Sequence, residues 1–240
     1  MASKEALVYD TNYTNTDGYK HGIRAMTRPR EEAEHFLETC GLAVLHLYKQ
    51  IPDLRRERER LANRIKDLEE HCKRVRSNAF VSIPYDPDDP DQPTAYQKIV
   101  WAPLKDHESE LQELERKRAR FLVELGATEE SSTALAGAVL QIAKQVLSYR
   151  FMGKPGNLNG EKMIGSQRIT EVIWEGRNHA LHYETGSPYL RVKQMLKTLG
   201  DDFNITFDSD QNNSLAILDL LGWKDATAVL SDLHALIRSE

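Results

Sequence analysis

The sequence predicts an all-α protein: a mostly helical bundle with a long antiparallel helical hairpin and a minor β element near the C-terminus. Two runs of apolar residues at heptad spacing, on either side of a segment rich in Pro and Asp, predict the hairpin. Apolar residues at helical spacing continue through most of the second half of the chain. The one expected strand is the short segment "NITF" at 204–207.

Composition narrows the class of protein. Of the 240 residues, 40% are apolar and 29% are charged, which is typical of a globular chain rather than a disordered one. The two cysteines, Cys40 and Cys72, fall in expected helices and indicate a reducing compartment rather than a disulfide framework. The first residues lack the apolar core of a signal peptide, and no run approaches the ~20 apolar residues that span a bilayer. We therefore expect a cytoplasmic protein without a membrane partner.

The chain divides into four expected parts. They are an extended arm at 1–30, a helical hairpin at 31–126, a helical core at 127–200 and a strand-and-helix extension at 201–240. The arm is expected because its sequence is polar and rich in turn formers.

The hairpin is the most regular part of the pattern. Its first helix carries nine heptad positions: Leu47, Ile51, Leu54, Arg58, Leu61, Ile65, Leu68, Cys72 and Val75. Pro52 predicts a kink or a new helix start near that position. The segment "SIPYDPDDPDQP" at 82–93 ends the helix, within an acidic, Pro-rich loop expected over 79–102. The second helix carries a matching seam: Leu104, His107, Leu111, Leu114, Arg118, Phe121 and Leu125.

Arg58 and Arg118 are the polar interruptions of the two seams. Charged clusters such as "RRERER" and "ERKRAR" flank them. Clusters of mixed sign predict solvated helix faces, with a track for RNA phosphates as the less common alternative.

The expected core begins with hydroxyl residues around Thr128 that predict a helix start, followed by an apolar helix. A Gly- and Pro-containing linker at 152–165 follows, and it does not fit a phosphate-binding loop because Met163 stands where the hydroxyl is required. Ser166 is expected to cap a helix that ends near Gly186 and Pro188. Further helices are expected over "YLRVKQMLKTL", "LAILDLL" and "KDATAVLSDLHALI".

Charge is distributed unevenly along the second half of the chain. Residues 140–199 contain nine Lys or Arg and four Glu, a balance of +5. Residues 200–240 contain eight acidic residues against two basic ones, a balance of −6. The first of these stretches is therefore the better place for an anionic ligand.

Within that basic stretch, "EVIWEGRNHALHYETG" at 171–186 concentrates polar side chains on one helix. Asn178 and His182 are four residues apart and share a face, whereas Arg177 is rotated from His182 by roughly 140° at 3.6 residues per turn. A long arginine side chain can still reach the same phosphodiester. Imidazole suits acid–base catalysis near neutral pH, and a guanidinium stabilises the extra charge of a phosphorane. The three residues together suit metal-independent RNA cleavage.

The run Arg177-Asn178-His179-Ala180-Leu181-His182 resembles the R-x(4–6)-H signature of HEPN domains, in which a polar residue, often Asn, follows the Arg. The resemblance covers roughly residues 131–200. It implies an all-helical homodimer with a composite active site and an endoribonuclease that needs neither metal nor cofactor. It also implies a toxin or phage-defence role, restrained by an antitoxin or another regulatory protein. RNA attack by the 2′-hydroxyl would leave a 2′,3′-cyclic phosphate.

On this interpretation Arg177, Asn178 and His182 are the catalytic residues. His182 is the general acid and base, Arg177 stabilises the phosphorane, and Asn178 positions the scissile group. His179, Tyr183 and Lys154 are expected to bind substrate. The chain departs from one pattern of the family: the Tyr that some members carry two residues past the motif His is replaced, since Tyr183 follows His182 directly and Glu184 takes that place.

Two other interpretations of the same residues remain open. Glu175, His179 and His182 have the spacing of metal ligands on one helical face, although the sequence nominates no ligand from a second element. Alternatively, Arg177, Asn178 and the histidines are ordinary packing or interface residues. The chain is then a non-catalytic helical dimerisation or interaction module, whose motif is a vestige or a nucleotide-binding surface.

Overall fold

The computed structural model describes residues 27–79, 92–185, 189–208 and 210–239, and it leaves the side chains of 78–79, 92–106 and 185 undescribed. Most of the expected N-terminal arm lies outside these ranges, and so does the first half of the expected Pro-rich loop, at 80–91. The second half of that expected loop is wrong, because residues 92–102 are helical. The described part confirms the all-α fold class. Its helices are α1 (Arg30–Ala79), α2 (Gln92–Phe151), α3 (Ile169–His182), α4 (Leu190–Phe203), α5 (Ser214–Leu221) and α6 (Ala226–Arg238), with a short 3-10 helix η1 (Tyr183–Thr185) after α3. None of the described helices is long and apolar enough to cross a membrane.

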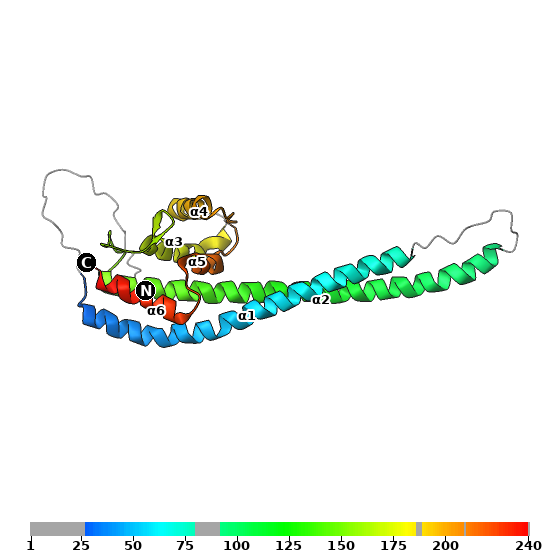
Figure 1. Ribbon diagram of the computed structural model, residues 1–240, viewed down its shortest axis with the longest axis horizontal. Coiled ribbons are helices and arrows are strands. Elements are labelled where there is room, and N and C mark those ends of the chain that lie inside the picture. The colour runs from blue at the N-terminus through cyan, green and yellow to red at the C-terminus, as the bar shows by residue number, and fades with distance from the viewer. Residues whose placement is uncertain (1–26, 80–91, 186–188, 209, 240) are drawn as a thin grey trace, which may run out of the picture.

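α1 and α2 form the long hairpin that the heptads predict (Figure 1). The smaller helices gather on one half of it, which we call the inner half, and the other half extends away from them. α1 continues through Pro52 as one helix. α2 is likewise continuous where a new helix was expected near Thr128. There the hydroxyls of Thr128, Ser131 and Ser132 donate to the carbonyl oxygens four residues earlier, so they join the helix instead of starting it.

The outer half of the hairpin is held by its heptad seam and by ion pairs beside it. Cys72 and Val75 of α1 pack against Leu114 of α2 in a small apolar cluster. Beside it, three ion pairs join the two helices at 2.6–2.7 Å: Arg58–Glu129, Arg118–Glu69 and Arg76–Glu115. The two arginines that interrupt the seams are therefore satisfied by glutamates of the opposite helix, as an antiparallel pairing allows.

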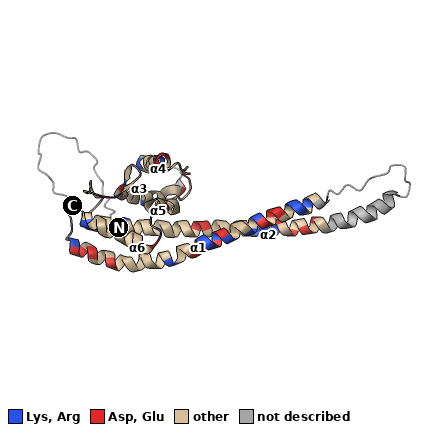
Figure 2. Ribbon diagram, viewed as in Figure 1, with Lys and Arg blue, Asp and Glu red and all other residues tan. Residues whose placement is uncertain are grey.

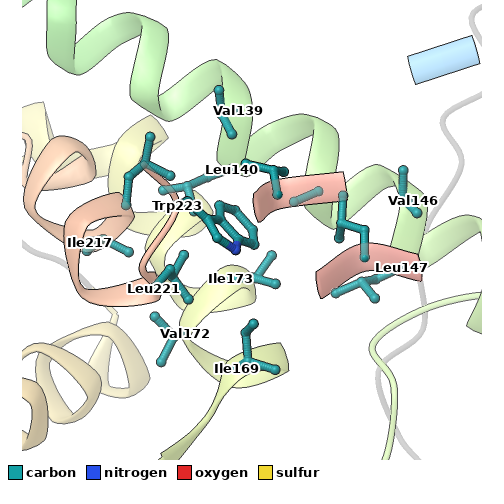
Figure 3. Close-up of a cluster of buried hydrophobic side chains, with 14 of the residues drawn as sticks. Val139, Leu140, Val146, Leu147, Ile169, Val172, Ile173, Ile217, Leu221 and Trp223 are labelled. Atoms are coloured by element: carbon teal, nitrogen blue, oxygen red, sulfur yellow. The ribbon is translucent and has the colours of Figure 1, made fainter. Parts of the chain in front are cut away.

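The main core lies at the inner half, where α3, α5 and α6 pack on the hairpin. Trp223 is at its centre, enclosed by side chains of α2, α3 and α5 (Figure 3). Its indole N–H donates to Asp232 at 2.8 Å, and its carbonyl accepts from the hydroxyl of Tyr48 at 2.8 Å. Gly222 has a φ of 75°, in the left-handed region that glycine adopts easily. It ends α5 and turns the chain toward α6, which places Trp223 in the core.

A two-stranded antiparallel sheet, β1 (Met163–Ile164) and β2 (Gln167–Arg168), precedes α3. The expected linker at 152–165 thus contains the first strand, and the second lies just beyond it. The strand expected at "NITF" is wrong, because residues 204–207 are not in a strand. The expected cap at Ser166 is also wrong. Ser166 lies in the turn between the strands, where its N–H and hydroxyl both donate to Asp202 of α4 at 2.7 and 2.8 Å. α3 therefore begins three residues later, at Ile169.

Candidate functional site

α3 has one buried face and one face that the rest of the described chain leaves open. Its buried stripe is the expected one, at spacings of three and four, and includes Ile169, Val172, Ile173 and Gly176. Arg177, Asn178 and His182 lie on the other side and are half-buried, and Leu181 between them is 53% exposed. The motif side chains are thus accessible from outside the bundle.

Arg177 and Asn178 belong to one hydrogen-bonded network with α2. The Nε of Arg177 donates to the side-chain oxygen of Gln141, and its Nη1 lies 3.3 Å from Oδ1 of Asn178. Lys144 donates to the same Oδ1 at 3.3 Å. One carboxamide oxygen therefore accepts from two cations, which fixes the orientation of Asn178 between them.

The other end of Asn178 reaches a buried carboxylate. Its Nδ2 donates to Oε2 of Glu175 at 3.2 Å, and Lys154 donates to Oε1 of Glu175 at 2.9 Å. Glu175 is only 3% exposed. A buried carboxylate is stable when it is paired and hydrogen-bonded, and both conditions are met here. We call Gln141, Lys144, Lys154, Glu175, Arg177 and Asn178 the α3 polar cluster.

The α3 polar cluster has an excess of positive charge. The cluster contains three cations, Lys144, Lys154 and Arg177, and one carboxylate. That buried carboxylate, Glu175, forms its ion pair with Lys154 at 2.9 Å, and Lys154 also lies 3.6 Å from Glu171. Burial lowers the pKa of Lys144, and the neighbouring Arg177 lowers it further. The Lys144 ammonium also lies over the ring of Trp174, 4.4 Å from its centroid. Such a group of cations favours an anion at its open side.

His182, the last residue of α3, lies beside Tyr189. Its ring meets that of Tyr189 edge-on, at a centroid distance of 5.7 Å and an angle of 89°. Tyr189 is 64% exposed and Leu190 beside it is 70% exposed. The imidazole therefore lies beside an exposed aromatic and apolar surface, at the end of α3 where the chain turns toward α4.

His179 is enclosed, with an exposed fraction of 1%. Its Nε2 lies 2.9 Å from the carbonyl oxygen of Gln211 and 3.0 Å from the side-chain nitrogen of Asn213. Burial lowers the pKa of His179, and the bond to Gln211 offsets part of this. The side chain holds the segment before α5 against α3. This placement does not fit the expected contact with substrate, because a polynucleotide at the surface cannot touch it.

The other two expected substrate-binding residues lie closer to the surface. Lys154 is held by Glu175 and Glu171, as described above. Tyr183 follows α3 in η1, and its hydroxyl donates to Glu184 at 3.2 Å. Burial raises the pKa of Tyr183, with Glu184 as the second cause. Its phenol therefore keeps its proton, which it donates to Glu184.

The metal-site interpretation finds no geometric support among the described residues, where no group of three His, Cys, Asp or Glu side chains could hold an ion. Glu175 turns toward Lys154 and Asn178, and His179 turns toward Gln211. The helical spacing of these ligands is correct, but their side chains bond to different elements.

Sequence reasoning missed Gln141 and Lys144, and it considered Glu175 only as a metal ligand. Gln141 and Lys144 are three residues apart on a helix that is otherwise apolar on that side, which is a signal for an inward-facing polar pair. A single helix pattern cannot tell such a pair from a solvated edge. Gln141 and Lys144 meet their partners, Arg177 and Asn178, because α3 packs against α2.

Comparisons of the chain with protein-family models, with curated proteins and with solved structures gave no match.

Proposed function

We propose that the chain is a metal-independent endoribonuclease of the HEPN type, which acts as a homodimer and serves as a toxin or phage-defence effector. The observation that carries the proposal is the open face of α3, where Arg177, Asn178 and His182 remain accessible beside a cluster with excess positive charge.

The proposed reaction divides the chemistry between the motif residues. His182 takes the proton of a ribose 2′-hydroxyl, whose oxygen forms a bond to the adjacent phosphorus. Arg177, oriented by Gln141 and Asn178, stabilises the phosphorane. The bond from phosphorus to the 5′-oxygen then breaks, and an imidazolium returns a proton to that oxygen. The products are a 2′,3′-cyclic phosphate and a 5′-hydroxyl, and the balance needs neither metal nor water.

The proposed active unit is a homodimer in which both copies contribute residues to one active site. Within one chain Arg177 contacts α2 while His182 lies beside Tyr189. A second copy, docked on the open face through Leu181, Tyr189 and Leu190, would bring the histidine of one copy toward the arginine of the other. All three residues are more than half exposed, and clustered exposed apolar side chains are typical of an interface.

The test is cleavage of RNA by the purified chain in excess EDTA. The proposal predicts fragments that end in a 2′,3′-cyclic phosphate, and loss of cleavage in both Arg177→Ala and His182→Ala. Lys193→Ala, an exposed cation on α4, is the matched control and should retain activity. Full cleavage by His182→Ala, or an absolute requirement for a divalent cation, would overturn the proposed mechanism.

A second function is favoured by one observation. Arg177 and Asn178 are tied into hydrogen bonds with Gln141, Lys144 and Glu175, so the motif also stabilises the joint between α2 and α3. A non-catalytic helical dimerisation or interaction module would keep this network without any RNA cleavage. In that case Arg177→Ala would lower the thermal midpoint of unfolding, and RNA would remain intact with every variant and at every salt concentration.

A further inference from the structure

The outer half of the hairpin carries a basic groove that the proposed catalytic site does not use. The groove has a volume of about 810 Å³ and lies between α1 and α2. Its lining comprises Arg60, Arg64, Asp67, Leu68, His71, Arg74, Lys117, Arg120, Phe121 and Glu124. Five of these are Lys or Arg and two are acidic, although the whole chain has a net charge of −5. Figure 2 shows the charged residues concentrated on this outer half.

The ion pairs that stabilise the hairpin do not account for these cations. The three Arg–Glu pairs that join α1 to α2, Arg58–Glu129, Arg118–Glu69 and Arg76–Glu115, use none of the groove residues. The histidine pair His71–Glu110, at 3.4 Å, also joins the two helices, but it uses none of the five Lys and Arg side chains of the groove. A hairpin that needed only stability would have opposite charges facing each other on both edges. On the groove edge, arginines of α1 instead face Lys117 and Arg120 of α2.

The cations of the groove are available to a ligand. Arg60, Lys117 and Arg120 each pair with a glutamate of their own helix, but their side chains remain 55–78% exposed. Exposed pairs of this kind contribute little to stability, so a phosphate can replace the carboxylate at little cost. Among the described residues, neither Arg64 nor Arg74 has a carboxylate within ion-pair distance.

Phe121 adds an aromatic surface to the groove. The guanidinium of Arg64 lies over its ring at 4.2 Å from the centroid. A positively charged groove that contains an aromatic ring and a planar guanidinium is the arrangement that binds single-stranded nucleic acid, because phosphates contact the cations and bases stack on the planar groups. An acidic protein segment would use the charges but not the stacking surface.

We infer that this groove binds single-stranded RNA outside the cleavage site and anchors long substrates on the hairpin. The inference rests on the proposed function for the identity of the polymer. Phe121 of the groove and Lys144 of the α3 polar cluster both belong to α2 and are separated by about 35 Å at ~1.5 Å per residue. A stacked RNA strand, at ~3.4 Å per nucleotide, reaches both when it contains about 10 nucleotides.

The experiment compares Arg64→Gln/Arg74→Gln with Lys66→Gln/Lys73→Gln. Both double variants remove two cations from exposed positions of α1, and only the first pair lines the groove. Binding of labelled RNA of ~6 and ~20 nucleotides is measured in the His182→Ala background by fluorescence anisotropy. Loss of two phosphate contacts should reduce the slope of log K against log salt concentration by about 1.4. Binding of the longer RNA should weaken about 25-fold at ~0.1 M salt. The control variant should show unchanged affinity for both RNAs.

The outcomes separate the groove from the catalytic proposal. If the long RNA binds equally to both double variants, the groove inference is wrong and the catalytic proposal is untouched. If the groove variant loses affinity but the wild-type chain cleaves no RNA, the groove stands as an RNA site and the nuclease proposal fails. If no RNA binds, both fail. If poly-glutamate competes with RNA at equal charge concentration, the groove is a site for acidic proteins and the RNA inference is overturned.

Discussion

Replacement of Glu175 by Gln tests the electrostatics of the α3 polar cluster, because it removes one charge and keeps the shape. Glu175 has a side chain that is 4% exposed, and its partner Lys154 is 26% exposed. Breaking a fully buried pair costs about 3–5 kcal/mol, whereas an exposed pair is worth about 0–1 kcal/mol. Since one partner is enclosed and the other reaches solvent, we expect Glu175→Gln to lower the free energy of unfolding by about 2 kcal/mol.

The same substitution should strengthen RNA binding. Lys144, Lys154 and Arg177 with Glu175 have a combined charge of +2, and Glu175→Gln raises it to +3. One more uncompensated cation increases the slope of log K against log salt concentration by about 0.7 for binding to a single strand. This corresponds to about fivefold tighter binding at ~0.1 M salt. Stability and RNA affinity therefore change in opposite directions.

Two measurements check this prediction: urea unfolding for the free energy, and anisotropy with labelled RNA in the His182→Ala background for the affinity. Glu38→Gln, which removes an exposed carboxylate at the start of α1, should change the free energy of unfolding by less than about 0.5 kcal/mol. Glu175→Gln/Lys154→Met should recover part of the lost stability, because it removes both partners. Unchanged stability together with weaker RNA binding would refute the charge balance we describe.

Three further predictions concern the fold around the site. Gly176→Val should lower the free energy of unfolding by about 1–3 kcal/mol in urea unfolding. A Cβ added at Gly176 would lie 3.3 Å from Ile217, and the further methyl groups of valine would overpack the core. Wild-type stability of this variant would mean that the core can rearrange there. Burial lowers the pKa of His179, so the unfolded chain takes up a proton on this imidazole at a higher pH than the folded chain does. The free energy of unfolding should therefore be constant above about pH 6.5 and fall as the pH decreases toward the folded pKa. His179→Gln should flatten this acid limb, and an unaltered limb would assign it to other groups. Tyr48→Phe leaves the buried carbonyl of Trp223 without its donor and should cost about 1–3 kcal/mol, and a smaller loss would show that water replaces the hydroxyl.

The fold class and the hairpin were predictable because heptad spacing is a local property of the sequence. Leu61, Ile65, Cys72 and Val75 are buried in the hairpin, and Arg58 and Arg118 find partners across it. A new helix was wrongly expected near Thr128, within α2, because Thr128 and Ser132 carry hydroxyls that either cap a helix or bond back within one. The choice depends on whether the preceding turn is already helical, which these residues do not determine.

The candidate site was predictable in its residue types but not in its partners. The position of Arg177, Asn178 and His182 on one short helix follows from their spacing. Gln141 and Lys144 lie more than thirty residues earlier, and only the packing of α2 against α3 brings them to Arg177 and Asn178. The enclosure of His179 likewise depends on the segment before α5, whose carbonyl at Gln211 is a tertiary partner.

The most direct test of the central claim is the distance between two copies of the open face of α3. Leu181→Cys places a spin label on that face between Arg177 and His182, at a position that is 53% exposed. Pulsed electron paramagnetic resonance should give a distance between protomers shorter than the ~30 Å diameter of a small domain. The same label at Val123, which is 74% exposed on α2, is the matched control for a site outside this face. A chain that remains monomeric while it cleaves RNA, or a dimer whose labels at position 181 lie farther apart than that diameter, would contradict a shared active site.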